Sequence, residues 1–354
     1  MKRIVLTGGG TAGHVTPNIA LLPRLRSADY EISYIGSMDG IEKKLIQAQG
    51  VPYYGISSGK LRRYFDLKNF TDPFRVLKGF AEASRLMKEL KPDVVFSKGG
   101  FVSVPVVMAA RKHHIPVVCH ESDLTPGLAN KLSMPSATKV CCNFPETLQY
   151  LPKGKAVLTG CPIRKELMQG SRLNALSMTG FSPDKPVLMV MGGSLGAAAV
   201  NQAVRDALPQ LLEKWQIIHL CGKGKLDESL RGTKGYIQYE YVQKELADLF
   251  ALCDIVVSRA GANAICELLA LRKPTLLIPL PARSSRGDQL LNARSFEQQG
   301  FSMVIEEEGL TRETFLAAVN RLAKHRQDYI RAMEECPQSD AIDTIMGILE
   351  ETTK

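Results

Sequence analysis

A glycine-rich segment near the start of the chain is the first feature whose residue types could do chemistry. Gly8–Gly13 reads Gly-Gly-Gly-Thr-Ala-Gly, follows an apolar run, and is followed by His14. Glycines let the backbone turn tightly and approach a phosphate, which the free N–H groups of a following helix can bind. A neutral imidazole at that helix start can act as a general base; the alternative is a histidine that only caps or packs the helix. We predict His14 as the catalytic base.

The same segment formally matches the dinucleotide fingerprint G-x-G-x-x-G, which raises an alternative function. A dinucleotide site also requires Asp or Glu at the end of the second strand, where it holds the ribose. Ile35-Gly36-Ser37 stands there instead. The sequence therefore disfavours a nicotinamide-dependent dehydrogenase.

A second glycine pair occurs in Ser97–Pro105, again after an apolar run. This segment could bind the diphosphate of an acceptor, although a plain structural turn explains a glycine pair equally well. Val117–Asp123 then places His120, Glu121 and Asp123 past another apolar run, where such residues line ligand crevices in open α/β sheets. His120 beside Glu121 could suggest a metal, but no further histidine at ligand spacing supports one, so we expect a hydrogen-bonding role for His120.

The second half of the chain repeats the pattern of strand, glycine turn and helix. Gly192–Gly196 opens a predicted helix whose N-terminus, with the hydroxyl of Ser194, can hold a diphosphate. In Ser258–Glu267, a second such turn precedes Glu267, whose carboxylate can accept both hydroxyls of a ribose. The alternative is a solvated helix glutamate, which its apolar neighbours disfavour. Arg283–Asn292 could read sugar hydroxyls and taken alone is only a surface loop.

Short β-branched runs that alternate with segments of helical period must position these motifs, and they predict an α/β fold with parallel sheets. Predicted helices include Glu42–Gln49, Pro73–Leu90, Asn201–Lys214 and Ala262–Leu271. The predicted strands are Arg3–Thr7, Glu31–Ile35, Tyr53–Ile56, Val94–Ser97, Val117–His120, Lys139–Cys142, Ala156–Thr159, Val187–Met191, Ile217–Leu220, Gly235–Tyr239, Ile255–Ser258, Thr275–Pro279 and Ser302–Ile305.

A chain of 354 residues is longer than a single core usually supports, and its two halves begin alike. We predict two Rossmann-like, doubly wound domains, residues 1–165 and 166–337, with a C-terminal helix in 338–354 that packs back on the first. Duplicated domains of this kind leave a cleft at the carboxyl ends of their strands, and ligands bind there. We therefore expect the active site between the domains.

Composition limits the partners and the location. The net charge of +9 suits an anionic partner, while a single Trp and the absence of nucleic-acid recognition motifs favour phosphate or lipid over nucleic acid. The segment Lys60–Lys78 mixes basic and aromatic residues, which suits an anionic membrane surface, although a solvated helix face explains it about as well. The N-terminal apolar run is too short for a signal peptide and no window is long enough to span a membrane, so we expect a cytoplasmic protein that binds membranes peripherally.

Several motifs, taken together in order and spacing, closely resemble the MurG family of GT-B glycosyltransferases. They are GGGTAGHVTP (8–17), GGFVSVP (99–105), HES-D…PGLANK (120–131), GCPIR (160–164), GGSLGA (192–197), SRAG…E (258–267) and DQLLNA (288–293). The resemblance covers nearly the whole chain. It implies two Rossmann-like domains around a cleft, no metal and no cofactor, and inverting transfer of N-acetylglucosamine (GlcNAc) from UDP-GlcNAc to an undecaprenyl-linked muramyl-peptide at the cytoplasmic face of the cell membrane.

The resemblance also implies roles for individual residues. His14 would deprotonate the 4-hydroxyl of the acceptor. The residues expected to bind UDP-GlcNAc are Thr11, Gly13, Asp123, Arg164, Gly193, Ser194, Tyr241, Val242, Arg259, Glu267, Asp288 and Gln289. Those expected to bind the acceptor diphosphate are Gly9, Gly10, Gly99, Gly100, Phe101 and Ser103.

Three departures from the family pattern bear on the contacts to the sugar. The family commonly has Asn at the position of Asp123, Gln at that of Leu195 and Gln at that of Asp288. The alternatives that remain are a related GT-B glycosyltransferase with another acceptor, a UDP-GlcNAc epimerase that needs no acceptor, and a binding protein without turnover. The presence of His14 in its motif disfavours the last.

Overall fold

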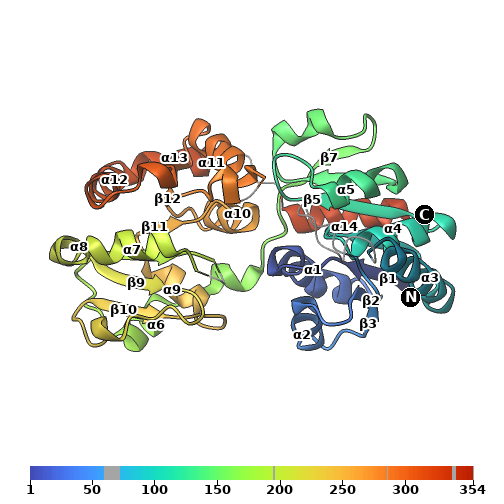
Figure 1. Cartoon of the computed structure of the whole chain (residues 1–354), viewed down its shortest axis with the longest axis horizontal. Helices are drawn as coiled ribbons and strands as arrows, with labels where there is room; N and C mark the ends of the chain where they lie inside the picture. Colours follow the sequence, from blue (N-terminus) through green and yellow to red (C-terminus); the bar gives the residue numbers. More distant parts are fainter. Residues whose placement is uncertain (60–71, 194–195, 285, 337–339, 354) are drawn as a thin grey trace. The chain divides into compact units, whose positions relative to one another are not determined.

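Two parallel β-sheets organise the chain in two compact units (Figure 1). The computed structural model describes residues 1–59, 72–193, 196–284, 286–336 and 340–353. Unit 1 comprises Met1–Arg164 with Gln338–Lys354, and unit 2 comprises Lys165–Pro337. The predicted fold class, α/β with two Rossmann-like doubly wound domains, is confirmed.

Unit 1 contains a seven-stranded sheet in the order β3-β2-β1-β4-β5-β6-β7, with every pair parallel. Its strands are β1 (Lys2–Thr7), β2 (Tyr30–Ser37), β3 (Tyr53–Ile56), β4 (Val94–Ser97), β5 (Val117–Glu121), β6 (Lys139–Cys142) and β7 (Ala156–Leu158). Its helices are α1 (Thr16–Ser27), α2 (Ile41–Gln47), α3 (Asp72–Leu90), α4 (Ser103–Lys112), α5 (Leu128–Ser133) and α14 (Ala341–Thr352). Since β1 lies between β2 and β4, the turns that follow β1 and β4 are neighbours.

Unit 2 contains a six-stranded parallel sheet in the order β10-β9-β8-β11-β12-β13. Its strands are β8 (Val187–Met191), β9 (Gln216–Leu220), β10 (Tyr236–Tyr239), β11 (Ile255–Ser258), β12 (Thr275–Leu277) and β13 (Ser302–Val304). Its helices are α6 (Arg172–Thr179), α7 (Ala198–Asp206), α8 (Leu208–Lys214), α9 (Leu246–Leu252), α10 (Ala262–Ala270), α11 (Asp288–Gln298), α12 (Arg312–Lys324) and α13 (Arg326–Glu335).

The prediction of one helix over Asn201–Lys214 is wrong. The structure has two helices there, with α7 ending at Asp206 and α8 starting at Leu208. Pro209 stands in the first turn of α8. It has no backbone N–H to continue the hydrogen bonds of α7, so the helix breaks before it.

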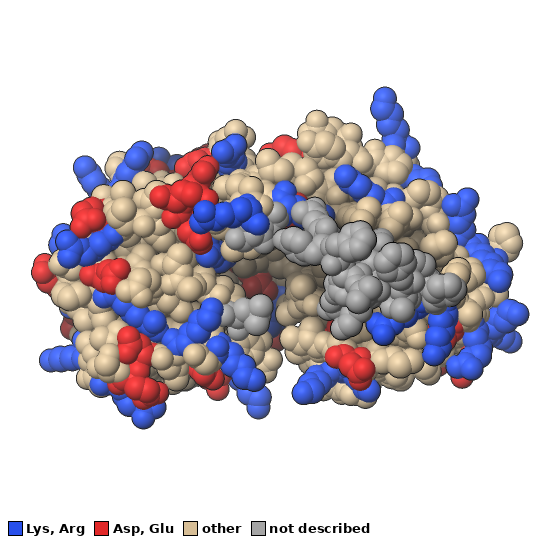
Figure 2. Space-filling view, in the orientation of Figure 1, with Lys and Arg blue, Asp and Glu red and all other residues tan. Residues whose placement is uncertain are grey.

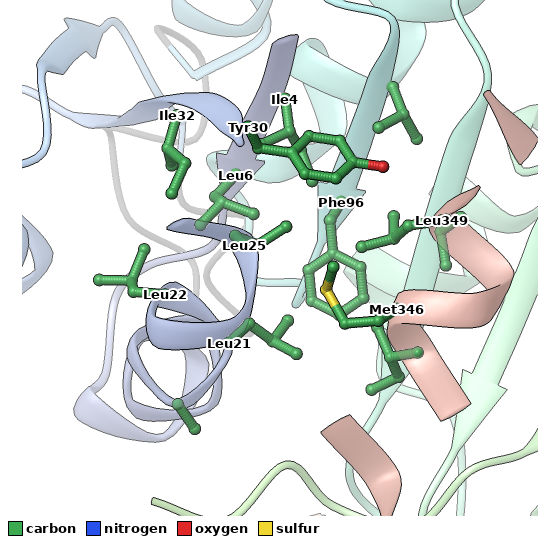
Figure 3. Close-up of a cluster of buried hydrophobic side chains, with 14 of the residues drawn as sticks. Ile4, Leu6, Leu21, Leu22, Leu25, Tyr30, Ile32, Phe96, Met346 and Leu349 are labelled. Atoms are coloured by element: carbon green, nitrogen blue, oxygen red, sulfur yellow. The ribbon is translucent and has the colours of Figure 1, made fainter. Parts of the chain in front are cut away.

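The C-terminal helix α14 belongs to the core of unit 1. Ile345 and Leu349 pack in one buried cluster with Ile4 of β1 and Phe96 of β4, as Figure 3 shows for Ile4, Phe96 and Leu349. The guanidinium of Arg24 on α1 lies 2.8 Å from the Asp343 carboxylate. An apolar face therefore holds the last helix against the first domain.

Candidate active site

The turn between β1 and α1 carries the predicted base. Residues Ala12–His14 form one turn of 3-10 helix, and α1 starts two residues after His14. Gly10 has a φ of +89°, a conformation that only glycine adopts readily. The imidazole of His14 is half-buried, and its Nδ1 lies 3.1 Å from the hydroxyl oxygen of Thr11. This pairing can orient the imidazole ring.

Two buried side chains that we did not predict, Tyr34 and Asn18, form hydrogen bonds with the backbone of this turn. The Tyr34 hydroxyl donates to the carbonyl of Gly8 over 2.7 Å. The Asn18 amide nitrogen donates to the Tyr34 hydroxyl oxygen over 3.2 Å and lies 3.4 Å from the carbonyl oxygen of His14. Burial raises the pKa of Tyr34, so its hydroxyl stays protonated and able to donate. The backbone on both sides of the base is therefore fixed.

A third such residue is Glu42, in the first turn of α2. It is fully buried, and its carboxylate accepts a hydrogen bond from the backbone N–H of Gly10 over 3.2 Å. We predicted that Gly10 binds an acceptor diphosphate, but in this structure its amide hydrogen is directed to Glu42. Gly36 and Gly40 leave space around the carboxylate.

The second glycine turn lies against the first. Gly99 and Gly100, after β4, have φ values of +89° and +86°. A Cβ atom on Gly100 would overlap the carbonyl oxygen of Gly9. The structure therefore brings together the glycines expected to bind the acceptor diphosphate. Ser103, also expected there, is buried and donates its hydroxyl to the Gly100 carbonyl over 2.7 Å, so it stabilises the turn, while Phe101 is half-buried.

Lys98 precedes these glycines and is almost fully buried, with 1% of its surface exposed. Its ammonium nitrogen lies 2.6 Å from Nδ1 of His120 and donates to the Ser122 hydroxyl over 2.6 Å. Nε2 of His120 lies 3.0 Å from the carbonyl oxygen of Gly160, so His120 accepts from Lys98 and donates to Gly160. Burial and the neighbouring ammonium lower the pKa of His120 well below its ordinary value, which keeps the ring neutral.

Glu121 organises the loop after β5. Its carboxylate accepts hydrogen bonds from the backbone N–H groups of Asp123 and Gly127, over 3.0 and 2.9 Å, and from the Asn130 amide over 2.8 Å. We expected the polar residues of this segment to face a ligand, but His120 and Glu121 are both buried among protein groups. Asp123 is half-buried, so its side chain is more exposed than those of His120 and Glu121.

In unit 2, the turn after β8 has the predicted glycine geometry. Gly193 and Gly196 have φ values of +81° and +67°. A Cβ on Gly196 would overlap the carbonyl oxygen of Cys221, so a larger residue would displace the backbone after β9. Ser194 and Leu195 lie outside the described residues.

The turns after β11 and β12 are joined by side chains. Arg259 donates to the carbonyls of Ile278 and Pro279 over 3.0 and 3.1 Å and forms an ion pair with Glu307. Gln289 accepts a hydrogen bond from the Leu280 N–H over 3.0 Å through its side-chain oxygen. These two residues were predicted to bind UDP-GlcNAc, and the structure also gives them a part in holding the loops.

The other residues predicted to bind UDP-GlcNAc occupy different positions. Glu267 is half-buried on α10, and Asp288 is paired with Arg286 at 2.8 Å in the first turn of α11. In the loop after β10, Tyr241 is exposed and Val242 is buried. The residues of this set that belong to unit 1 are Thr11, Gly13, Asp123 and Arg164, of which Arg164 is the last residue of its segment.

Among the residues that the structure describes, no group of three or more His, Cys, Asp or Glu side chains is placed to hold a metal ion. A search of the described helices for one long and apolar enough to cross a membrane finds none.

Two doubly wound parallel sheets, whose first strands β1 and β8 are each followed by a glycine turn and a helix, form the architecture of the GT-B fold. Family models agree: the glycosyltransferase family 28 N-terminal domain matches residues 4–142, and the C-terminal domain of that family matches residues 187–345.

Curated relatives and a solved structure narrow the class. The UDP-N-acetylglucosamine–N-acetylmuramyl-(pentapeptide) pyrophosphoryl-undecaprenol N-acetylglucosamine transferase of Lachnospira eligens is 64% identical over all of both chains. That of Lachnoclostridium phytofermentans is 65% identical over 99% of each. The crystal structure of Acinetobacter baumannii MurG superposes with a TM-score of 0.77 at 25% identity and covers 99% of this chain and 100% of that one. The chain belongs to the MurG family within glycosyltransferase family 28.

Proposed function

We propose that this protein transfers GlcNAc from UDP-GlcNAc to the 4-hydroxyl of an undecaprenyl-diphosphoryl muramyl-pentapeptide, in peptidoglycan synthesis. The observation that carries this proposal is the identity of 64% over the whole chain with a relative named for that reaction. The turn that places the Thr11 hydroxyl beside the His14 imidazole also supports the proposal, because transfer to a hydroxyl needs a positioned general base.

The proposed reaction is a single displacement with inversion. Nε2 of His14 takes the proton of the acceptor hydroxyl while its oxygen bonds to C1 of GlcNAc, and UDP leaves from the opposite face. We propose that Nδ1–H of His14 donates to the Thr11 hydroxyl oxygen, 3.1 Å away, in the tautomer whose Nε2 carries no proton. Transfer to the acceptor therefore requires His14 in its neutral form.

The charge on the leaving UDP has to be offset as the bond breaks. We propose that the backbone N–H groups at the start of α7, after the glycine turn at Gly193, do so together with Ser194. Glu267 would bind the ribose hydroxyls, and Tyr241 with Val242 the uracil. The chemistry assigned to these groups needs no divalent metal, so we expect activity to persist in EDTA.

We further propose that unit 1 binds the cytoplasmic face of the membrane through adjoining surfaces of α3, α4 and α5. Exposed apolar side chains lie on all three helices, at Leu77, Met108, Leu128 and Leu132. The exposed basic residues around them are Arg75, Lys78, Arg111, Lys112 and Lys131. Figure 2 shows Lys and Arg side chains gathered over the end of unit 1 where Figure 1 draws α3 and α4.

Apolar side chains among cationic ones suit an anionic lipid surface. Arg75, Leu77 and Lys78 of this surface belong to the predicted patch Lys60–Lys78, whose residues 60–71 lie outside the described residues. Flotation with vesicles that contain anionic lipid tests the assignment: replacing Leu77 and Met108 with Ser should weaken binding, and unchanged binding would contradict it.

The test of the function compares acceptors. Labelled UDP-GlcNAc is incubated in EDTA with a short-chain muramyl-pentapeptide diphosphate lipid, with a diacylglycerol, and without an acceptor. A β-1,4-linked product formed only with the first acceptor supports the proposal. Transfer to diacylglycerol would favour a different acceptor class, turnover without acceptor would favour an epimerase, and no turnover in any arm would favour a binding protein.

A further inference from the structure

The turn that carries His14 is fixed at three points, and each uses a different side chain. Tyr34 holds the carbonyl of Gly8, and Asn18 reaches the carbonyl of His14. Glu42 holds the middle of the turn, where it accepts from the N–H of Gly10. Of these three side chains, Glu42 carries the charge that is costly to bury without hydrogen-bond donors.

The donors to Glu42 come from the ends of two adjacent strands. Besides Gly10, after β1, the backbone N–H of Ser37 at the end of β2 donates over 3.1 Å, and the Ser37 hydroxyl donates as well. Hydrogen bonds to a charged carboxylate are stronger than those between neutral groups, so several of them hold the connected segments firmly. Glu42 therefore ties the turn after β1 to the end of β2.

Three glycines leave room for the Glu42 side chain. A Cβ on Gly9 or Gly40 would overlap the Glu42 carboxylate, and one on Gly36 would lie 3.0 Å from its Cγ. A solvated helix glutamate would need no such space. The local sequence is thus adapted to bring this carboxylate under the turn.

We propose that Glu42 is a positioning residue for the base, acting on His14 through the Gly10 amide; this inference rests on the proposed role of His14. Without the carboxylate, the Gly10 N–H loses its partner and the segment from Gly10 to His14 is free to shift. A displacement near 1 Å of a catalytic group costs roughly 100-fold in rate. The residues proposed to bind the ribose and the uracil, Glu267, Tyr241 and Val242, lie in unit 2, so the affinity for UDP should change little when Glu42 is replaced.

The experiment measures kcat for transfer to a soluble short-chain acceptor, and UDP affinity by calorimetry, in five variants of the full chain. Glu42→Ala should lower kcat by about 30- to 100-fold with UDP affinity within twofold. Glu42→Gln should recover most of this loss, because its amide oxygen can still accept from Gly10. Glu42→Asp keeps the charge but is too short to reach both strand ends, so it should lower kcat as well; it decides the matter if the alanine variant fails to fold.

Glu82 provides the matched control. Its carboxylate accepts from the backbone N–H of Ser57, just after β3, over 2.6 Å, and does not contact the His14 turn. Glu82→Ala should keep kcat within about threefold.

A kcat within twofold of the unsubstituted enzyme in Glu42→Ala, or in Glu42→Asp if the alanine variant does not fold, would overturn the inference. So would an equal loss in Glu82→Ala. His14→Ala, measured in parallel, distinguishes the role of His14 from that of Glu42. Full activity in His14→Ala would contradict the role of His14 as the base. Loss of activity in His14→Ala together with full activity in Glu42→Ala would contradict only the role of Glu42.

Discussion

The hydroxyl oxygen of Thr11 lies 3.1 Å from Nδ1 of His14, across a single turn of 3-10 helix. Both groups stand on a backbone segment that Tyr34, Asn18 and Glu42 hold in place. The imidazole therefore extends from a fixed backbone segment, and its Nδ1 lies beside the Thr11 hydroxyl. Such an arrangement suits a base whose second nitrogen must meet a substrate hydroxyl in one geometry.

The first prediction concerns this pair. Thr11→Val keeps the shape of the side chain but removes the hydroxyl, so the ring loses its orienting partner. A hydrogen bond of this kind contributes about 1–1.5 kcal/mol, so kcat should fall about tenfold. Thr11→Ser should restore it. If Val instead raised the KM for UDP-GlcNAc with kcat unchanged, Thr11 would be a donor contact and not an orienting group.

The second prediction concerns the ribose contact. Glu267→Ala should weaken UDP binding by roughly 10- to 100-fold, the effect of losing hydrogen bonds to a charged group, and leave the acceptor KM unchanged. In the unsubstituted enzyme, UDP whose ribose lacks the 2′-hydroxyl should bind more weakly than UDP. In Glu267→Ala, the two nucleotides should bind with equal affinity. Glu335→Ala removes an exposed helix glutamate of the same unit and serves as the control. Unchanged UDP affinity in Glu267→Ala would assign the ribose to another residue.

The strand pattern could be predicted from the sequence, because strands that are buried in parallel sheets are short apolar runs rich in β-branched residues. Each predicted strand is present, with ends that differ by at most two residues. The glycine turns at Gly10, Gly99 and Gly193 could also be found, since their positive φ values require glycine.

The residues that support the site could not be found in this way. Glu42 stands beside two lysines and reads as a solvated residue, yet its partner Gly10 is 32 positions away. Lys98 likewise pairs with His120, 22 positions on. Such contacts depend on which strands become neighbours in the sheet, and no local period records that order.

The third prediction concerns the stability of unit 2 at acid pH. Burial lowers the pKa of His219 to about 3, with a smaller contribution from Arg205. In the unfolded chain the pKa is near 6.5, so below that pH the unfolded state binds the proton that the folded state refuses. The contribution of neutral His219 to stability is therefore fully present above about pH 6.5 and is lost as the pH falls towards 3. At pH 5 the loss from this one residue amounts to about 2 kcal/mol.

The measurement is urea unfolding followed by the fluorescence of Trp215, the single tryptophan, which lies in the core of unit 2. His219→Gln can keep bonds to the Tyr236 hydroxyl and the Asn201 amide, which His219 contacts at 2.8 and 3.0 Å. The drop in stability between pH 7 and pH 5 should be smaller in this variant by about 2 kcal/mol. An equal drop in both proteins would show that His219 does not titrate on unfolding as described.

The most direct test of the central claim is the turnover of His14→Ala with UDP-GlcNAc and the muramyl-pentapeptide acceptor, together with its affinity for UDP-GlcNAc. Loss of a general base should lower kcat by about 10²- to 10⁴-fold and leave donor affinity nearly unchanged. Turnover close to that of the unsubstituted enzyme would contradict the assignment of His14 as the base.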